Sequence, residues 1–410
     1  MQNKRFLILI SVVALAIIVA FGAIFYFSLK KGPGEVPVPS PRELTDFGAK
    51  PTEGIGEGSP TETEAEPETG TGGVVEVALP KLRQISTLPI AGVGVFEEQT
   101  TSTIKQTMLK FADKTTGNIY EAIIGTLEQK KVSTTEIFGV HDAVFGERGE
   151  SVALRYLKED DKTIETFLGA LPKNGEGELV GSFLPENVLS LGVSPDGKNI
   201  FYLFSSGDGV VGINSLIDGS KKSQVFDSAF SEWAADWPNQ RLISLLSKPS
   251  SRVLGYLYSL DPQNGSFEKI LSGISGLTAK LSPDGKAVLY ADNGLGLKIY
   301  DIKNKTSAGL GVKTLPEKCV WGKNNVSLYC AVPQFLPEGE YPDSWYQGLI
   351  SFSDSIWKID AGSNTTTLLA NPSASFGNNI DAIKLQLSPD GNYLFFINKK
   401  DSTLWGLGLI

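Results

Sequence analysis

The chain has 410 residues, with 37 lysines and arginines against 46 aspartates and glutamates, so its net charge at pH 7 is −9. No extended run of basic residues interrupts this acidic composition, which argues against a nucleic-acid-binding protein. One histidine and two cysteines provide no cluster with the spacing of a zinc site, and we expect no cofactor.

The first predicted element is a membrane-spanning helix at residues 6–29, a stretch without charged side chains. A helix needs about 20 apolar residues to cross a bilayer. No convincing cleavage site follows, so we expect an uncleaved anchor rather than a cleaved signal peptide. Lys4 and Arg5 precede the span, and Lys30 and Lys31 follow it. The α-amino group favours a cytoplasmic N-terminus and places the rest of the chain outside the cytoplasm, at the cell membrane.

Residues 32–80 are rich in proline, glycine, glutamate and threonine, with ten acidic and two basic side chains. Such a segment cannot bury enough apolar surface to offset the entropy lost on ordering, so we expect a disordered acidic linker. The predicted organisation is therefore an anchor at 1–31, a linker at 32–80 and a folded head at 81–410.

The head contains one tetrapeptide three times, each copy lying between two strand-like apolar runs. In this turn the proline presets φ, the aspartate bonds its own backbone and the glycine takes the positive φ that closes a hairpin. The residues of the three copies are Ser194, Pro195, Asp196 and Gly197, then Ser282, Pro283, Asp284 and Gly285, then Ser388, Pro389, Asp390 and Gly391.

Degenerate turns at 146–149, 237–240 and 322–325 occupy the same place between strand-like runs, and residues 88–135 form one more unit. The spacing of about 40–45 residues is that of a four-stranded propeller blade. The turns and their strands resemble the TolB-type, WD-repeat-like β-propellers of bacterial envelope proteins over about residues 88–410. The prediction is an all-β, seven-bladed β-propeller.

The last unit has room for two more strands after its turn, at about 392–397 and 402–409. Three strands would leave an open edge, which a closed propeller does not tolerate. We expect residues 81–87, which precede the first unit, to supply the missing outer strand.

Cys319 and Cys330 lie in one predicted hairpin. With a loop of residues 323–326 they are directly opposite each other, within reach of a disulfide. We predict that they are bonded; the alternative is two separate buried thiols.

Other chemical motifs are weak. Residues 207–212 match the dinucleotide-binding pattern G-x-G-x-x-G, but a strand-like run follows, so we interpret them as a glycine-rich hairpin. His141 would have to serve any Ser-His-Asp site, yet no nucleophile elbow occurs. The repeat turns do not match the S-x-D-x-G boxes of sialidase-type propellers, and we identify no catalytic residue.

The longest gap between turns indicates an insertion at about 333–352, rich in aromatic residues. Large rigid rings favour recognition, so we predict that Phe335, Tyr341, Trp345 and Tyr346 are candidate partner-binding residues. The alternative is a loop whose rings fold back onto the blade.

The sequence favours a membrane-anchored, extracytoplasmic propeller that binds or scaffolds an envelope or surface protein. The alternative is a propeller enzyme, a hydrolase or lyase on glycan or peptide, with carboxylates at the mouth of its channel. A sensor domain of a larger assembly is a third reading.

Overall fold

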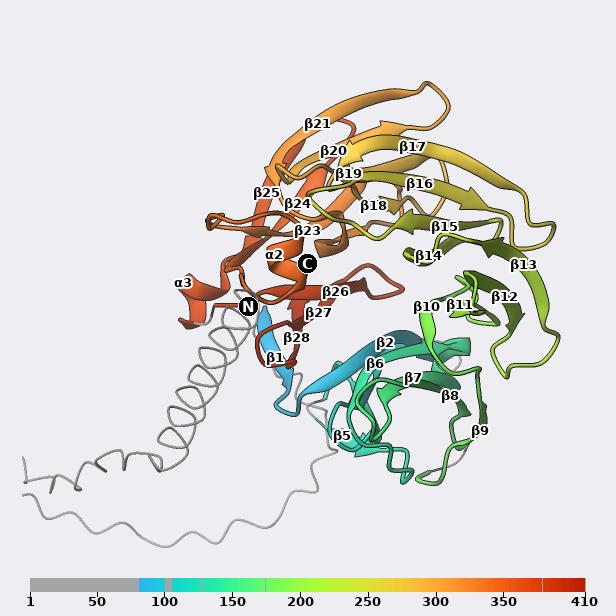
Figure 1. Cartoon of the computed structure of the whole chain (residues 1–410). Coiled ribbons are helices and arrows are strands. Elements are labelled where there is room, and N and C mark those ends of the chain that lie inside the picture. The colour runs from blue at the N-terminus through green and yellow to red at the C-terminus, as the bar shows by residue number, and fades with distance from the viewer. Residues whose placement is uncertain (1–80, 100–104, 127, 174, 378, 410) are drawn as a thin grey trace, which may run out of the picture. The chain divides into compact units, whose positions relative to one another are not determined.

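Seven antiparallel sheets of four strands each make up the computed structural model, which describes residues 81–409 except 100–104, 127, 174 and 378 (Figure 1). The fold is an all-β, seven-bladed propeller, as the sequence predicts. The first strands of adjacent blades contact one another, as β2 with β6 and β10 with β14, so these strands line the centre.

Each of the first three blades follows chain order. Blade 1 contains β2 (Ile90–Gln99), β3 (Lys105–Asp113), β4 (Ile119–Ile123) and β5 (Gln129–Lys131). Blade 2 contains β6 (Val140–Gly146), β7 (Ser151–Leu157), β8 (Ile164–Ala170) and β9 (Val180–Phe183). Blade 3 contains β10 (Val188–Val193), β11 (Asn199–Ser205), β12 (Val210–Leu216) and β13 (Ser223–Ser228).

The next three blades repeat this order. Blade 4 contains β14 (Trp233–Asn239), β15 (Leu242–Ser247), β16 (Leu254–Leu260) and β17 (Phe267–Ser275). Blade 5 contains β18 (Thr278–Leu281), β19 (Ala287–Ala291), β20 (Gly296–Asp301) and β21 (Thr306–Lys313). Blade 6 contains β22 (Cys319–Trp321), β23 (Ser327–Pro333), β24 (Asp354–Asp360) and β25 (Thr365–Ala370).

Blade 7 joins the two ends of the described chain. It contains β26 (Ala382–Leu387), β27 (Tyr393–Asn398), β28 (Leu404–Gly408) and, as its outer strand, β1 (Leu82–Ser86). Leu82 pairs with Leu407 in the β1–β28 ladder, which confirms the predicted closure. The short helices are η1 (Glu147–Gly149), η2 (Pro316–Lys318), α2 (Asp343–Tyr346) and α3 (Pro372–Phe376).

The repeated tetrapeptide is a structural turn that links the first two strands of a blade. In the first copy the buried Ser194 hydroxyl donates to Asp196 Oδ1 at 2.6 Å and accepts the Asn199 N–H at 2.9 Å, while Gly197 has φ +74°. The second and third copies repeat these contacts from Ser282 and Ser388. The aspartates are therefore occupied by turn bonds.

The degenerate turns also connect first and second strands, with one correction. Residues Trp237 and Pro238, predicted to lie in a turn, belong to β14, which bulges there and extends to Asn239. A proline cannot donate to the ladder, so the pairing register shifts before the chain turns.

The cores lie between neighbouring blades. Phe201 and Leu203 of blade 3, for example, pack in one cluster with Trp237 and Ile243 of blade 4. Since both faces of each sheet are covered, strands such as β27 are almost continuously buried, which explains their lack of clean alternation.

The predicted cysteine pair is confirmed. Cys319 and Cys330 are opposite each other on β22 and β23, with their Cα atoms 4.1 Å apart, and they form a disulfide. The glycine-rich residues 207–212 form the turn and first part of the β11–β12 hairpin, as predicted. No helix in the described ranges has the length and hydropathy of a membrane span. The anchor predicted at residues 6–29 and the linker predicted at 32–80 lie outside the described residues.

Candidate partner-binding surface

The insertion connects β23 to β24 at residues 334–353, one residue from the predicted bounds. It folds onto the head through a small apolar cluster. Tyr341, Trp345 and Phe352 pack there with Leu295 of blade 5 and Leu315 before blade 6. We call the side of the propeller that carries this insertion the insertion face.

Two of the four predicted partner-binding rings lie in the interior. Trp345 is 3% exposed and Tyr341 is 8% exposed, so neither offers a surface to a partner, and our expectation for these two is corrected. Their rings are needed to bury the insertion against the blades. Phe335 is 74% exposed and Tyr346 is 40% exposed, and these two remain candidates. The sequence reading missed Leu349, which is 74% exposed.

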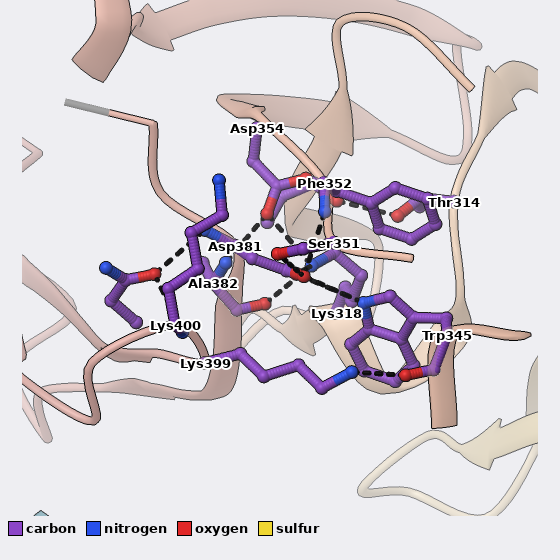
Figure 2. A network of polar contacts seen from close by, with 12 residues as sticks. Thr314, Lys318, Trp345, Ser351, Phe352, Asp354, Asp381, Ala382, Lys399 and Lys400 are labelled. Atoms are coloured by element: carbon purple, nitrogen blue, oxygen red, sulfur yellow. Dashed lines mark hydrogen bonds and ion pairs between the residues drawn. The ribbon is translucent and has the colours of Figure 1, made fainter. Parts of the chain in front are cut away.

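A buried ionic cluster holds the insertion in place. Lys318 at the end of η2 points its ammonium at Asp381 Oδ1 (2.5 Å) and Asp354 Oδ2 (2.9 Å), and none of the three side chains is exposed (Figure 2). The Lys318 ammonium also donates to the Ala382 carbonyl at 2.9 Å. Asp381 precedes β26 and Asp354 begins β24, so the cluster ties blades 6 and 7 together.

Asp381 forms direct hydrogen bonds with the insertion. Its Oδ2 accepts Trp345 Nε1 at 2.9 Å, the Ser351 hydroxyl at 3.1 Å and the Phe352 N–H at 3.0 Å (Figure 2). Burial alone would raise the pKa of Asp381, but the Lys318 ammonium and these donors outweigh it and lower that pKa. An ionised Asp381 is thus the anchor on which the insertion folds.

Further charged groups close the cluster on its solvent side. The Lys399 ammonium lies 4.0 Å from the centre of the Trp345 ring and donates to the Trp345 carbonyl (Figure 2). Burial lowers the pKa of Lys399. The Tyr346 hydroxyl donates to Glu317 Oε2 at 2.6 Å. Burial and the Glu317 carboxylate raise the pKa of Tyr346, and burial raises the pKa of Glu317.

The insertion also reaches blade 4. Arg252 in the β15–β16 loop donates to Glu340 from Nε and Nη2 at 3.0 and 2.8 Å. Beside it, the Ser251 N–H donates to Asp343 Oδ2 at 2.5 Å. The insertion and the β15–β16 loop therefore form one continuous surface.

Next to this contact lies an apolar hollow of about 960 Å³, which we call the blade-4 groove. Its lining includes the exposed ion pair Lys248–Glu232 (2.7 Å) and Arg252. Its apolar and aromatic lining residues are Phe230, Trp233, Val253, Leu254, Tyr256 and Tyr258.

Aromatic rings that pack against one another form the floor of the groove. Trp233 contacts Phe230 and Tyr258 edge-on, with ring centres 5.0 and 5.7 Å apart, and Tyr258 stacks on Phe267 at 4.4 Å. Above this floor Phe230, Val253 and Leu254 are about half exposed or more. Exposed apolar side chains gathered in one hollow form a ready contact for another molecule.

His141 does not take part in a catalytic arrangement. It lies on β6 with part of its side chain open to solvent, and partial desolvation of the ring together with the Arg155 charge lowers its pKa. The neighbouring Asp142 is paired with Lys384 (2.6 Å) and Arg155 (3.3 Å). Its carboxylate therefore braces blades 7 and 2 instead of orienting the histidine.

The opposite side of the propeller has two further hollows, of about 790 and 950 Å³, which share the end of β2 (Phe96–Gln99). The larger one includes the Ser194–Gly197 turn, Arg148 and Asp236 among its lining residues. Charged side chains of both signs are among the residues that line these two hollows.

No family model and no curated protein matches the sequence. Among solved structures, the chain is similar to an oligogalacturonate lyase from Vibrio parahaemolyticus, with 12% identity and a TM-score of 0.48, over 79% of this chain and 98% of that one. It is also similar to TolB from Acinetobacter baumannii, with 13% identity and a TM-score of 0.41, over 67% of this chain and 78% of that one. Both are β-propellers, and at these identities the likeness concerns the fold alone.

Proposed function

We propose that the propeller is a protein-binding or scaffolding module and that its partner docks on the insertion face, over the blade-4 groove. One observation carries this proposal: exposed apolar and aromatic side chains share one groove with charged side chains of both signs, Glu232, Lys248 and Arg252. This composition is that of a protein–protein interface, in which a desolvated core lies inside a polar rim. The partner therefore presents an apolar anchor flanked by charge.

The cellular setting is part of the same proposal. Residues 6–29 anchor the chain in the cell membrane with the N-terminus in the cytoplasm, and the acidic linker at 32–80 carries the head outside it. The TolB-type resemblance of the repeat turns supports an envelope or surface protein as the partner.

The alternative is a hydrolase or lyase acting on glycan or peptide. In its favour, two carboxyl groups of the described residues have pKa values raised by burial, Glu317 and Asp354. Against it, Glu317 is bonded by Tyr346 and Asp354 is closed off from solvent. Turnover of a glycan or peptide library by the purified full-length chain, lost in Glu317→Gln, would establish this second reading.

The binding proposal is tested with a photo-crosslinking residue placed at Leu254 in the full-length protein, in its native cells. The matched control is the same residue at Val180, which is 76% exposed on blade 2, away from the groove. We expect one envelope protein, identified by mass spectrometry, to crosslink from position 254 and not from 180. Equal crosslinking from both positions, or none from 254, would reject the surface.

The same capture is then measured with Phe230→Ala/Leu254→Ala, against Val180→Ala/Phe183→Ala as a control that removes one carbon less of apolar side chain. Truncating an interface hot spot costs about 2 kcal/mol or more, roughly a 30-fold loss of affinity. Both double variants should retain the stability of the wild type within about 1 kcal/mol, because surface substitutions rarely cost more. An unchanged affinity in the groove variant would contradict the proposal.

A further inference from the structure

Two carboxyl groups share one ammonium in the interior of the head. Asp354 and Asp381 both contact Lys318 Nζ, and the side chains of all three are fully shielded from solvent. If both carboxyl groups were ionised, the three side chains would carry a net negative charge in a place shielded from solvent. Such burial is costly unless a proton or a partner neutralises the excess charge.

The hydrogen-bond donors around the two carboxyl groups show that a negative charge is stabilised less well on Asp354 than on Asp381. Asp381 accepts from four groups, so its charge is stabilised on both oxygens. Asp354 accepts from Lys318 and from the Ala382 N–H (2.7 Å), both at Oδ2. Its Oδ1 is buried and has no hydrogen-bond partner. Burial raises the pKa of Asp354 despite the Lys318 ammonium, in agreement with this asymmetry.

The nearby Lys399 ammonium supports Asp381, since the two charges attract each other. Lys399, from the β27–β28 loop, directs its ammonium to the Trp345 carbonyl and ring. Glu317, on η2, is bonded by the Tyr346 hydroxyl of the insertion. On the β26 side, Asp381 itself repels a second carboxylate at this place.

We propose that Asp354 is a protonated carboxylic acid in the folded protein and that this proton keeps the insertion bound to the head. We call this protonated carboxyl group the latch. Neutral Asp354 leaves the Lys318 ammonium to Asp381, and the paired Asp381 holds Trp345, Ser351 and Phe352. When the proton leaves, Asp354 competes for the ammonium and repels Asp381, so the grip on residues 334–353 weakens. The structure thus supplies a pH-sensitive element next to the blade-4 groove.

The regulatory role of the latch at the partner-binding surface rests on the proposed function. The proton and the hold on the insertion are properties of the head itself. They are measured without any partner, so their failure and the failure of the binding proposal are separate outcomes.

The first test is infrared spectroscopy of the full-length protein at neutral pH. The spectra are recorded with Glu317→Gln, which removes the other carboxyl group whose pKa is raised by burial. We expect the carbonyl band of a buried protonated carboxyl group, which is lost on adding Asp354→Asn and kept on adding the control Asp208→Asn, an exposed turn residue. A Glu317→Gln spectrum that lacks this band, or a band that persists when Asp354→Asn is added, would overturn the proposal.

The second test is hydrogen exchange of peptides that cover residues 334–353, across a pH series and corrected for intrinsic exchange. In the wild type we expect exchange to accelerate at alkaline pH by roughly ten-fold or more, as local opening becomes easier. Asp354→Asn should keep the slow neutral-pH exchange and lose the pH response. Fast exchange in Asp354→Asn at neutral pH would mean that an ionised Asp354 holds the insertion, and would refute the latch.

Discussion

Arg252 and Glu340, 88 residues apart in the chain, form a two-point ion pair that joins blade 4 to the blade-6 insertion. Both side chains are mostly exposed, and exposed pairs contribute less than about 1 kcal/mol to stability. The pair matters because it places the insertion beside the blade-4 groove. We therefore expect Arg252→Ala to change the free energy of unfolding by less than about 1 kcal/mol while weakening partner capture. Glu340→Ala should behave in the same way, and a large loss of stability in either variant would contradict this role.

Replacing Asp381 should be much more damaging than replacing Asp354. Asp381→Ala leaves Lys318 without its main counterion and removes the acceptor of Trp345 Nε1, and breaking a buried pair costs about 3–5 kcal/mol. The free energy of unfolding measured in urea should fall by that amount. Asp354→Asn, which keeps a neutral side chain of the same shape, is the control, and an equal loss in both variants would refute the assignment.

The protonation of Asp381 at acid pH gives a second prediction for this residue. The folded-state pKa of Asp381 is lowered, so its contribution to stability is fully present above the unfolded value of about 3.9. That contribution should disappear as the pH falls through the folded-state pKa. The measurement is the unfolding free energy between neutral and strongly acid pH, and Asp381→Ala should lack this part of the slope. A parallel slope in the variant would contradict the prediction.

Truncating Trp345 should lower the stability of the protein much more than removing the hydroxyl of Tyr346. Trp345→Ala removes a buried ring and should cost about 3–5 kcal/mol. Tyr346→Phe removes only the hydroxyl that donates to Glu317, which should cost about 0.5–1.5 kcal/mol. Thermal melts of both single variants test this, and a Trp345→Ala protein as stable as the wild type would show that the insertion is not packed on the head.

The disulfide should contribute modestly. It closes a short loop between residues 11 positions apart, for which chain entropy gives roughly 2–3 kcal/mol at most. The gain should be smaller because the β22–β23 hairpin is already ordered locally. Urea unfolding of Cys319→Ser/Cys330→Ser measures the loss, and a cost well above that range would mean that the bond does more than close this hairpin.

The repeat made most of the fold predictable. Each Ser-Pro-Asp-Gly turn forms its own bonds within six residues, so the pattern is readable from local sequence, and the spacing then determines the number of blades. The turn at Trp237 was misplaced because a β-bulge changes the strand length without changing its composition. For Trp345 the alternative reading, a ring folded back onto the head, is the one that holds. Local sequence could not decide between the two readings, because its partner Asp381 comes from another blade, 36 residues further on.

The groove and the ionic cluster were missed for the same reason. Lys318 ends η2, Asp354 begins β24 and Asp381 precedes β26, and each reads as an ordinary surface charge in the sequence. Phe230 precedes β14 and Leu254 begins β16, and only the fold brings them to one hollow. The sequence holds one weak indication of the ionic cluster: the acidic Asp381 stands directly before the apolar strand β26.

The central claim is that a partner covers the insertion face, and hydrogen exchange of the crosslink-identified complex tests it most directly. We predict slower exchange on binding in peptides that cover residues 228–233 and 248–256, with no change at the repeat turns 194–197, 282–285 and 388–391. Protection at the repeat turns, with the groove peptides unchanged, would place the partner on the opposite side of the propeller and contradict the account.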